Sequence, residues 1–156
     1  MSTTASPRTR PDLGGRTDEG IDPRGPRFTA ALTSVVLVAV LLLPSPAGVV
    51  LLAAQAALFA VGAVRGVQHT PYAWLFRTVV RPRLAPPSDW EDPAPPRFAQ
   101  GVGLAFAVVG LVALLAGATV VGQVAVGAAL VAALLNAVFA FCLGCEVYLL
   151  VRRATA

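Results

Sequence analysis

The sequence predicts an all-α fold, a polytopic membrane protein built as a bundle of four transmembrane helices. Of its 156 residues, 56% are hydrophobic and only 13% are charged, and the mean hydropathy is +0.74. A soluble domain is about 25% charged. All twelve basic residues other than the single histidine are arginines, and they flank long apolar runs. A short motif precedes both the first and the third run.

Four apolar runs define the expected elements. Residues 1–20 are polar and aperiodic, which predicts a disordered tail. Residues 21–153 form the predicted membrane domain, with a cytoplasmic loop over 65–97 and helices at about 28–44, 47–64, 98–118 and 121–151. Each run is close to the length of about 17–25 residues that a spanning helix needs. Helices are expected because backbone groups in hydrocarbon must be bonded internally.

The positions of the arginines predict the orientation in the membrane. They precede the first helix, fill the loop 65–97 and follow the last helix, whereas the two short connections carry no charge. By the positive-inside rule, both termini are expected in the cytoplasm, in a multi-pass protein of the cell (plasma) membrane. A basic chain can also bind nucleic acid. We expect no nucleic-acid partner, because these arginines flank apolar runs instead of forming one basic patch.

The loop between the second and third runs is too polar to span. Its segment 72–76 reads Tyr-Ala-Trp-Leu-Phe and is followed by arginines, a pattern that suits a helix lying on the inner leaflet. An aromatic belt at the end of the second helix explains the same residues. The proline-rich segment 85–96 predicts a stiff, solvated loop.

A repeat of the pattern D-P-x-x-P-R-F indicates two related halves. Residues 22–28 and 92–98 carry it, seventy residues apart, each before a predicted helical hairpin. Two spans per half predict parallel pseudo-repeats about an axis along the membrane normal. Arg27 and Arg97 would then face each other, with Arg24, at a cytoplasmic mouth. Alternatively, these arginines reach the lipid headgroups and the phenylalanines anchor below them.

Cys142 and Cys145 form a C-x-x-C pair near the end of the last predicted helix. Residues three apart share a helical face, and C-x-x-C is a common redox spacing. Helical neighbours have Cβ atoms about 5–6 Å apart, whereas a disulfide needs about 3.8 Å. A helix that loosens or breaks near Gly144 would permit the bond. The alternative is that both cysteines are simply small apolar residues in a membrane helix.

Glu146 and His69 are the remaining candidate site residues. A carboxylate in a membrane helix usually has a function or a partner, so we expect Glu146 to pair with Arg24, Arg27, Arg97 or another basic residue of the same face. His69 is a weaker candidate, as a proton shuttle or a tuner of a thiol, since a lone loop histidine is usually just solvated. Too few ligands are available to predict a metal site, and no cofactor is implied.

The F-C-L-G-C-E-V-Y segment, residues 141–148, and the D-P-R-x-x-R-F segment, residues 22–28, resemble a bacterial membrane family, domain-of-unknown-function family 4395. The resemblance covers about residues 21–153. It implies a four-helix membrane protein. Because members are often associated with thioredoxin-like or sulfurtransferase-type proteins, it also implies such a soluble partner on the cytoplasmic side, beside the lipid bilayer itself.

Three functions are therefore compatible with the sequence. The first is thiol-disulfide exchange or sulfur relay through Cys142 and Cys145. The second is a small transporter or permease in which these cysteines and Glu146 line a substrate path. The third is a membrane scaffold whose basic surface holds a soluble partner or anionic lipid. Whether the protein is an enzyme stays open, because fold-level analogy does not decide function.

Overall fold

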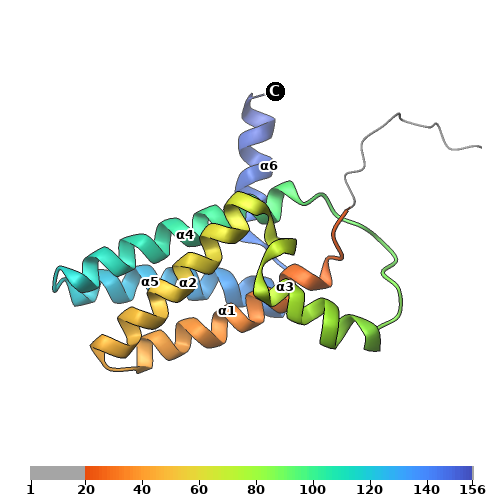
Figure 1. The fold of residues 1–156 in the computed structure, drawn as a ribbon. Coiled ribbons are helices and arrows are strands. Elements are labelled where there is room, and N and C mark those ends of the chain that lie inside the picture. The colour runs from red at the N-terminus through yellow and green to blue at the C-terminus, as the bar shows by residue number, and fades with distance from the viewer. Residues whose placement is uncertain (1–19, 156) are drawn as a thin grey trace, which may run out of the picture.

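The computed structural model describes residues 20–155, so nearly all of the predicted tail lies outside the described part of the chain. These residues form an all-α fold, as predicted (Figure 1). Four helices are long and apolar enough to cross a membrane: α1 Arg24–Leu42, α2 Ser45–Arg65, α4 Ala94–Leu115 and α5 Thr119–Phe139. They alternate in direction, so the two short turns, 43–44 and 116–118, share one end of the bundle, and the long connection 66–93 lies at the other.

Helices α1 and α4 begin four residues earlier than their apolar runs predict. In each copy of the repeated motif the aspartate lies at the start of the helix. Asp22 Oδ1 accepts a hydrogen bond from the N–H of Arg24 at 3.0 Å, and Asp92 Oδ1 accepts one from the N–H of Ala94 at 2.8 Å. Carboxylates at this position satisfy N–H groups that have no partner within the helix.

The last predicted helix, 121–151, is wrong in extent. Helix α5 ends at Phe139, and a separate helix, α6 Leu143–Thr155, follows. The break is at Ala140, which has a φ of 55° and a left-handed backbone. Its N–H bonds to the carbonyl of Asn136 at 3.1 Å, which closes the end of α5. Figure 1 shows α6 running away from the bundle, across the direction of α5.

The four long helices form a closed ring, in which α1 packs against α2 and α5, and α4 against α2 and α5. The core between them is apolar and consists of Leu37, Val40, Leu52, Ala56, Phe59, Ala107, Val126 and Ala129. The outward positions are also apolar: Val35, Val50, Val112 and Val124, for example, are each at least 61% exposed. Large apolar patches on the outside of a soluble protein would be unstable in water, so this surface suits a bilayer.

The predicted loop contains further helical structure. Val67–His69 form the short 3₁₀ helix η1, and α3 Pro71–Leu75 continues into the π-helical turn η2 Phe76–Val80 and the 3₁₀ turn η3 Arg81–Arg83. A helix on the membrane surface is one of the two explanations given above for this aromatic and basic segment. That explanation requires helical structure there, and residues 71–80 are helical. The segment docks on the bundle through Phe76, whose ring centroid lies 5.7 Å from that of Phe28.

The two copies of the repeated motif lie side by side. Ile21 and Glu91, the residues immediately before each copy, form an isolated antiparallel bridge. The N–H of Ile21 donates to the carbonyl of Glu91 at 2.9 Å, and the N–H of Glu91 donates to the carbonyl of Ile21 at 3.0 Å. The chain segments that lead into α1 and α4 are therefore held together at one end of the bundle.

Candidate thiol site

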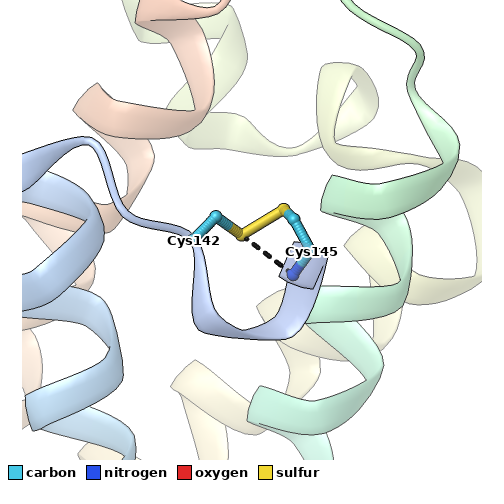
Figure 2. Close-up of a disulfide and its surroundings, with 2 residues drawn as sticks. All are labelled: Cys142 and Cys145. Atoms are coloured by element: carbon cyan, nitrogen blue, oxygen red, sulfur yellow. Dashed lines mark hydrogen bonds between the residues drawn. A yellow bond between two sulfur atoms is a disulfide. The ribbon is translucent and has the colours of Figure 1, made fainter. Parts of the chain in front are cut away.

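Cys142 and Cys145 are joined by a disulfide at the break between α5 and α6 (Figure 2). Their Cα atoms are 5.2 Å apart, within the range that a disulfide requires. The expectation that both project from one face of a continuous helix is wrong, because Cys142 lies before α6 and only Cys145 lies within it. The break brings the sulfur atoms together where an unbroken helix would hold them too far apart.

Cys142 occupies the position of an N-cap for α6. Its Sγ accepts a hydrogen bond from the N–H of Cys145 at 3.3 Å, drawn as a dashed line in Figure 2. Its carbonyl accepts the N–H of Glu146 at 3.0 Å. The first N–H groups of a helix have no partner inside it and carry partial positive charge. The sulfur of Cys142 therefore lies where negative charge is favoured.

Gly144 lets this turn approach α4. A Cβ atom built on Gly144 would lie 2.6 Å from the Cβ and 2.7 Å from the Cα of Ala99. Only a residue without a side chain fits there. Four residues beyond Gly144, the ring of Tyr148 packs on that of Phe98, with centroids 5.6 Å apart. The sequence indicates Gly144 only as a point where the helix could loosen or break. Its packing role depends on α4, which no local pattern reveals.

A cavity of about 430 Å³ opens beside the disulfide. It is enclosed by α1, α4, α5 and the start of α6, and both cysteines line it. Its charged lining residues are near the motif copies: Arg24, Arg27 and Glu91. Further in, the walls are mostly small apolar residues, together with Thr29 and Thr33. The volume is in the range of small-molecule sites.

Glu146 is exposed in the first turn of α6. Between residues 20 and 155 the structure contains no ion pair for it, so the predicted pairing with an arginine is not formed. Arg97 instead donates from Nε to the carbonyl of Ala63 at 2.7 Å and from Nη2 to that of Val64 at 2.8 Å. These carbonyls are at the end of α2, where the helix dipole is negative. A carboxylate at the start of α6 likewise complements the positive end of its dipole.

Arg27 makes the corresponding contact on the other side of the bundle. Its Nη2 donates to the carbonyl of Ala137, near the end of α5, at 3.4 Å. Arg27 and Arg97 therefore each bind the end of a helix from the other half of the chain. Arg27 also lines the cavity beside the cysteines, whereas Arg97 does not.

Arg24 forms an ion pair with Asp22, with Nη2 3.0 Å from Oδ2. The same guanidinium donates to the carbonyl of Ala85 at 3.0 Å, which ties the loop to the start of α1. The hydrogen bond from Arg24 lowers the pKa of the Asp22 carboxyl below its ordinary value, although burial acts in the opposite direction. Arg24 therefore has a structural partner of its own, besides lining the cavity.

His69 is exposed at the end of η1 and is not among the residues that line the cavity. Within the described range, no three histidine, cysteine or acidic side chains gather as they would around a metal ion. The residues that the structure does bring together are the two cysteines, Arg27 and the polar groups of the cavity wall.

The spanning helices and the apolar exterior define an integral membrane protein that carries a disulfide at one end of its bundle. Residues 21–153 match the profile of the family described as Domain of unknown function (DUF4395), and the chain belongs to this family. The resemblance noted from the two motifs is thereby confirmed. Neither a curated protein nor a solved structure matches the chain.

Proposed function

We propose that this protein is a membrane thiol-disulfide exchange protein in which Cys142 and Cys145 react with a soluble thiol protein. The position of their disulfide supports this most strongly: it lies at a helix N-terminus, half-buried at the mouth of a cavity. A stabilising role would be weak, because the stability gained from a disulfide grows with the length of the loop that it closes. This disulfide encloses only two intervening residues.

The exchange balances as two successive displacements. A partner thiolate attacks one sulfur of the disulfide, so the S–S bond breaks, a mixed disulfide forms and the other cysteine leaves as a thiolate. A second partner thiol then attacks the mixed disulfide. The partner ends oxidised, and Cys142 and Cys145 hold the two electrons. In a sulfur relay, a persulfide on one cysteine would be attacked by the other, which forms the same disulfide and releases sulfide.

Cys142 is the proposed attacking thiolate of the reduced pair. Its Sγ is 3.3 Å from the N–H of Cys145 and faces the positive end of the α6 dipole. Both interactions favour a negative sulfur. Cys145, one turn into α6, is the proposed resolving cysteine.

We propose that the cysteines are at the cytoplasmic face, with both termini in the cytoplasm. The described arginines all lie at or near the bundle end that carries α3 and α6, and cytoplasmic segments are rich in such residues. Helix α6 has apolar exposed residues such as Leu150 and Val151 as well as Arg152 and Arg153. This composition suits a helix lying in the interface between water and lipid. A thioredoxin-like or sulfurtransferase-type partner would reach the disulfide from that side.

We also propose that the two halves are related by a pseudo-twofold axis along the membrane normal. Equivalent residues pair across the bundle: Ile21 with Glu91 by backbone bonds, and the two motif arginines with opposite helix ends. The rings of Phe28 and Phe98 each pack on an aromatic residue of the following surface helix, Phe76 and Tyr148 respectively. Each half would then contain two spanning helices and one surface helix.

In this arrangement the cysteines replace an ordinary helix cap. Thr70 Oγ1 accepts from the N–H of Ala73 at 3.3 Å at the start of α3. Cys142 and Cys145 occupy the same relative positions at the start of α6, with the same distance. The turn at the start of α6 would thus hold the reactive cysteines, whereas the equivalent turn at the start of α3 only caps its helix.

A transporter remains the second candidate because of the cavity of about 430 Å³ between the halves. Substrate sites of transporters are found at such interfaces between repeats. The two functions differ in their need for the sulfur atoms. Transport through the cavity would survive Cys142→Ser and Cys145→Ser, whereas thiol exchange would not.

Trapping of mixed disulfides tests the proposal. In cells that express Cys145→Ser, the Cys142 thiolate is expected to attack the disulfide of the oxidised partner, displace one partner thiolate and remain joined to that soluble protein until a reducing agent releases it. Cys142→Ser is expected to trap less, and the double variant nothing. The proposal fails if neither single variant traps a partner, or if the double variant traps the same proteins.

Thiol labelling tests the orientation. After mild reduction, a membrane-impermeant maleimide is expected to label Cys142 and Cys145 in inverted vesicles and not in right-side-out vesicles. Labelling restricted to right-side-out vesicles would reverse the proposed topology.

A further inference from the structure

The cavity beside the disulfide extends into the membrane-spanning part of the bundle. Its lining runs from Cys142 and Cys145 to Thr33 on α1 and to Phe106, about midway along α4. Thr33 is nine residues from the start of α1, roughly 13 Å at the rise of about 1.5 Å per residue. An occupant could therefore touch the disulfide while the rest of it lies at the depth of the lipid.

One polar group in the cavity wall has no partner. Thr29 is 3% exposed, and its Oγ1 is buried without a hydrogen-bond partner. A buried hydroxyl without a partner is unusual in a native structure and calls for an explanation. Thr29 lies on the wall of the cavity, one helical turn from Thr33. Thr29 and Thr33 together make this part of the α1 wall the polar side of an otherwise mostly apolar cavity.

The remaining lining defines the chemistry of the occupant. Small side chains such as Gly103, Ala129 and Ala132 form much of the wall, so a flat apolar group has room between α4 and α5. Asn136 adds a side-chain amide on the wall closer to the disulfide. The charged lining residues of the described chain lie at the motif end, so the deeper part is suited to an uncharged molecule.

The thiol chemistry adds a second requirement. If a soluble dithiol reduces the Cys142–Cys145 disulfide, then re-forming the disulfide requires an acceptor of two electrons and two protons. An uncharged, mostly apolar acceptor with hydrogen-bonding oxygen atoms, reached from the bilayer, has the chemistry of a quinone.

We propose that this cavity binds the ring of a membrane quinone, which oxidises the reduced cysteine pair; the inference rests on the thiol-exchange function proposed above. The S–H bonds of Cys142 and Cys145 break and one S–S bond forms. The two carbonyl oxygens of the quinone take up the two protons and two electrons and become the hydroxyls of the quinol. The quinone oxygens lie toward the α1 wall, which carries Thr29 and Thr33. Electrons thus pass from a soluble dithiol, through the cysteine pair, to a quinone of the bilayer.

The test uses the full-length protein in lipid nanodiscs. The pair is reduced with dithiothreitol, the reductant is removed, and decylubiquinone is added without oxygen. The ring of this quinone has no free position for thiol addition. We expect loss of two thiols for each quinol formed, with a rate that saturates as the quinone concentration rises.

Two substitutions test the cavity itself. Ala132→Phe fills it and is expected to slow oxidation by the quinone at least tenfold. The matched control is Val131→Phe, on the neighbouring residue, which is 58% exposed on the outside of the bundle and does not line the cavity; it should react like the wild type.

The outcomes separate the two proposals. If dithiothreitol cannot reduce the disulfide in the folded protein, the exchange function itself fails. If the disulfide is reduced readily but the quinone does not reoxidise it, or oxidises Ala132→Phe and Val131→Phe at the wild-type rate without saturation, only the quinone site fails. An unchanged rate in Ala132→Phe would also overturn it.

Discussion

Gly144 and Ala99 are in such close contact that a Cβ on Gly144 would overlap the Cβ of Ala99, at 2.6 Å. This contact holds the first turn of α6, and with it the disulfide, against the first turns of α4. Neither partner is the flexible end of a long side chain, so the overlap cannot be relieved without moving α6.

Gly144→Ala is therefore expected to destabilise the docked turn by about 1–3 kcal/mol, as overpacking does. The midpoint of thermal unfolding in detergent should fall, and the disulfide should be reduced faster. Gly127→Ala is the matched control, because a Cβ at Gly127 in the middle of α5 has nothing within 4 Å. There the change should be neutral or stabilising, since alanine favours helix over glycine by about 1 kcal/mol. Equal effects of both substitutions would contradict the packing role.

Ala140 provides a test of the broken helix. Because its φ is 55°, Ala140→Gly removes backbone strain and is expected to leave the unfolding midpoint unchanged or to raise it. Ala137→Gly, one turn earlier and inside α5, should cost about 1 kcal/mol. If α5 instead continued unbroken through residue 140, the two substitutions would destabilise the protein equally.

Arg97 and Arg27 make equivalent contacts of different quality. Arg97 donates two hydrogen bonds, of 2.7 and 2.8 Å, to the end of α2, and Arg27 donates one of 3.4 Å to the end of α5. Arg97→Gln should therefore lower stability by about 1–2 kcal/mol and Arg27→Gln by less, when unfolding midpoints are compared. A larger loss of stability in Arg27→Gln than in Arg97→Gln would show that these hydrogen bonds do not determine which arginine contributes more.

Asp22 predicts a pH dependence of stability. Its pKa is lowered in the folded protein, chiefly by the hydrogen bond from Arg24. The carboxylate therefore stabilises the fold above the unfolded pKa of about 4, and this contribution disappears as the pH falls through the lower folded value. Unfolding midpoints of the wild type should begin to drop as the pH falls below about 4.

Asp22→Asn should lower stability at pH 7 by about 1–2 kcal/mol. It should also make the acid-induced decrease of the unfolding midpoint smaller. Asp89→Asn is the control, because Asp89 is exposed in the loop and its carboxylate accepts only the hydroxyl of Ser88, at 2.9 Å. It should leave the acid-induced decrease unchanged. A decrease of the same size in Asp22→Asn as in the wild type would exclude this ion pair as its source.

The amino-acid sequence determined the spanning helices. An apolar run long enough to cross a bilayer must satisfy its own backbone groups, so its length and composition suffice to define a helix. The family also followed from two short motifs, residues 22–28 and 141–148. The profile of that family matches residues 21–153. The predicted starts of α1 and α4 are four residues late because they follow the apolar runs, whereas the helices begin beside Asp22 and Asp92, which bond to their first N–H groups.

Only the tertiary structure decided the arrangement of the thiol site. Alanine is the strongest helix former, so nothing local indicates that Ala140 ends α5. The break depends on α6 docking against α4 through Gly144, a contact between segments more than forty residues apart. The same break allows Cys142 and Cys145 to bond, exposes Glu146 without an arginine partner and forms one wall of the cavity. Hydropathy is a property of each segment, whereas a left-handed residue and a cavity depend on how segments pack against one another.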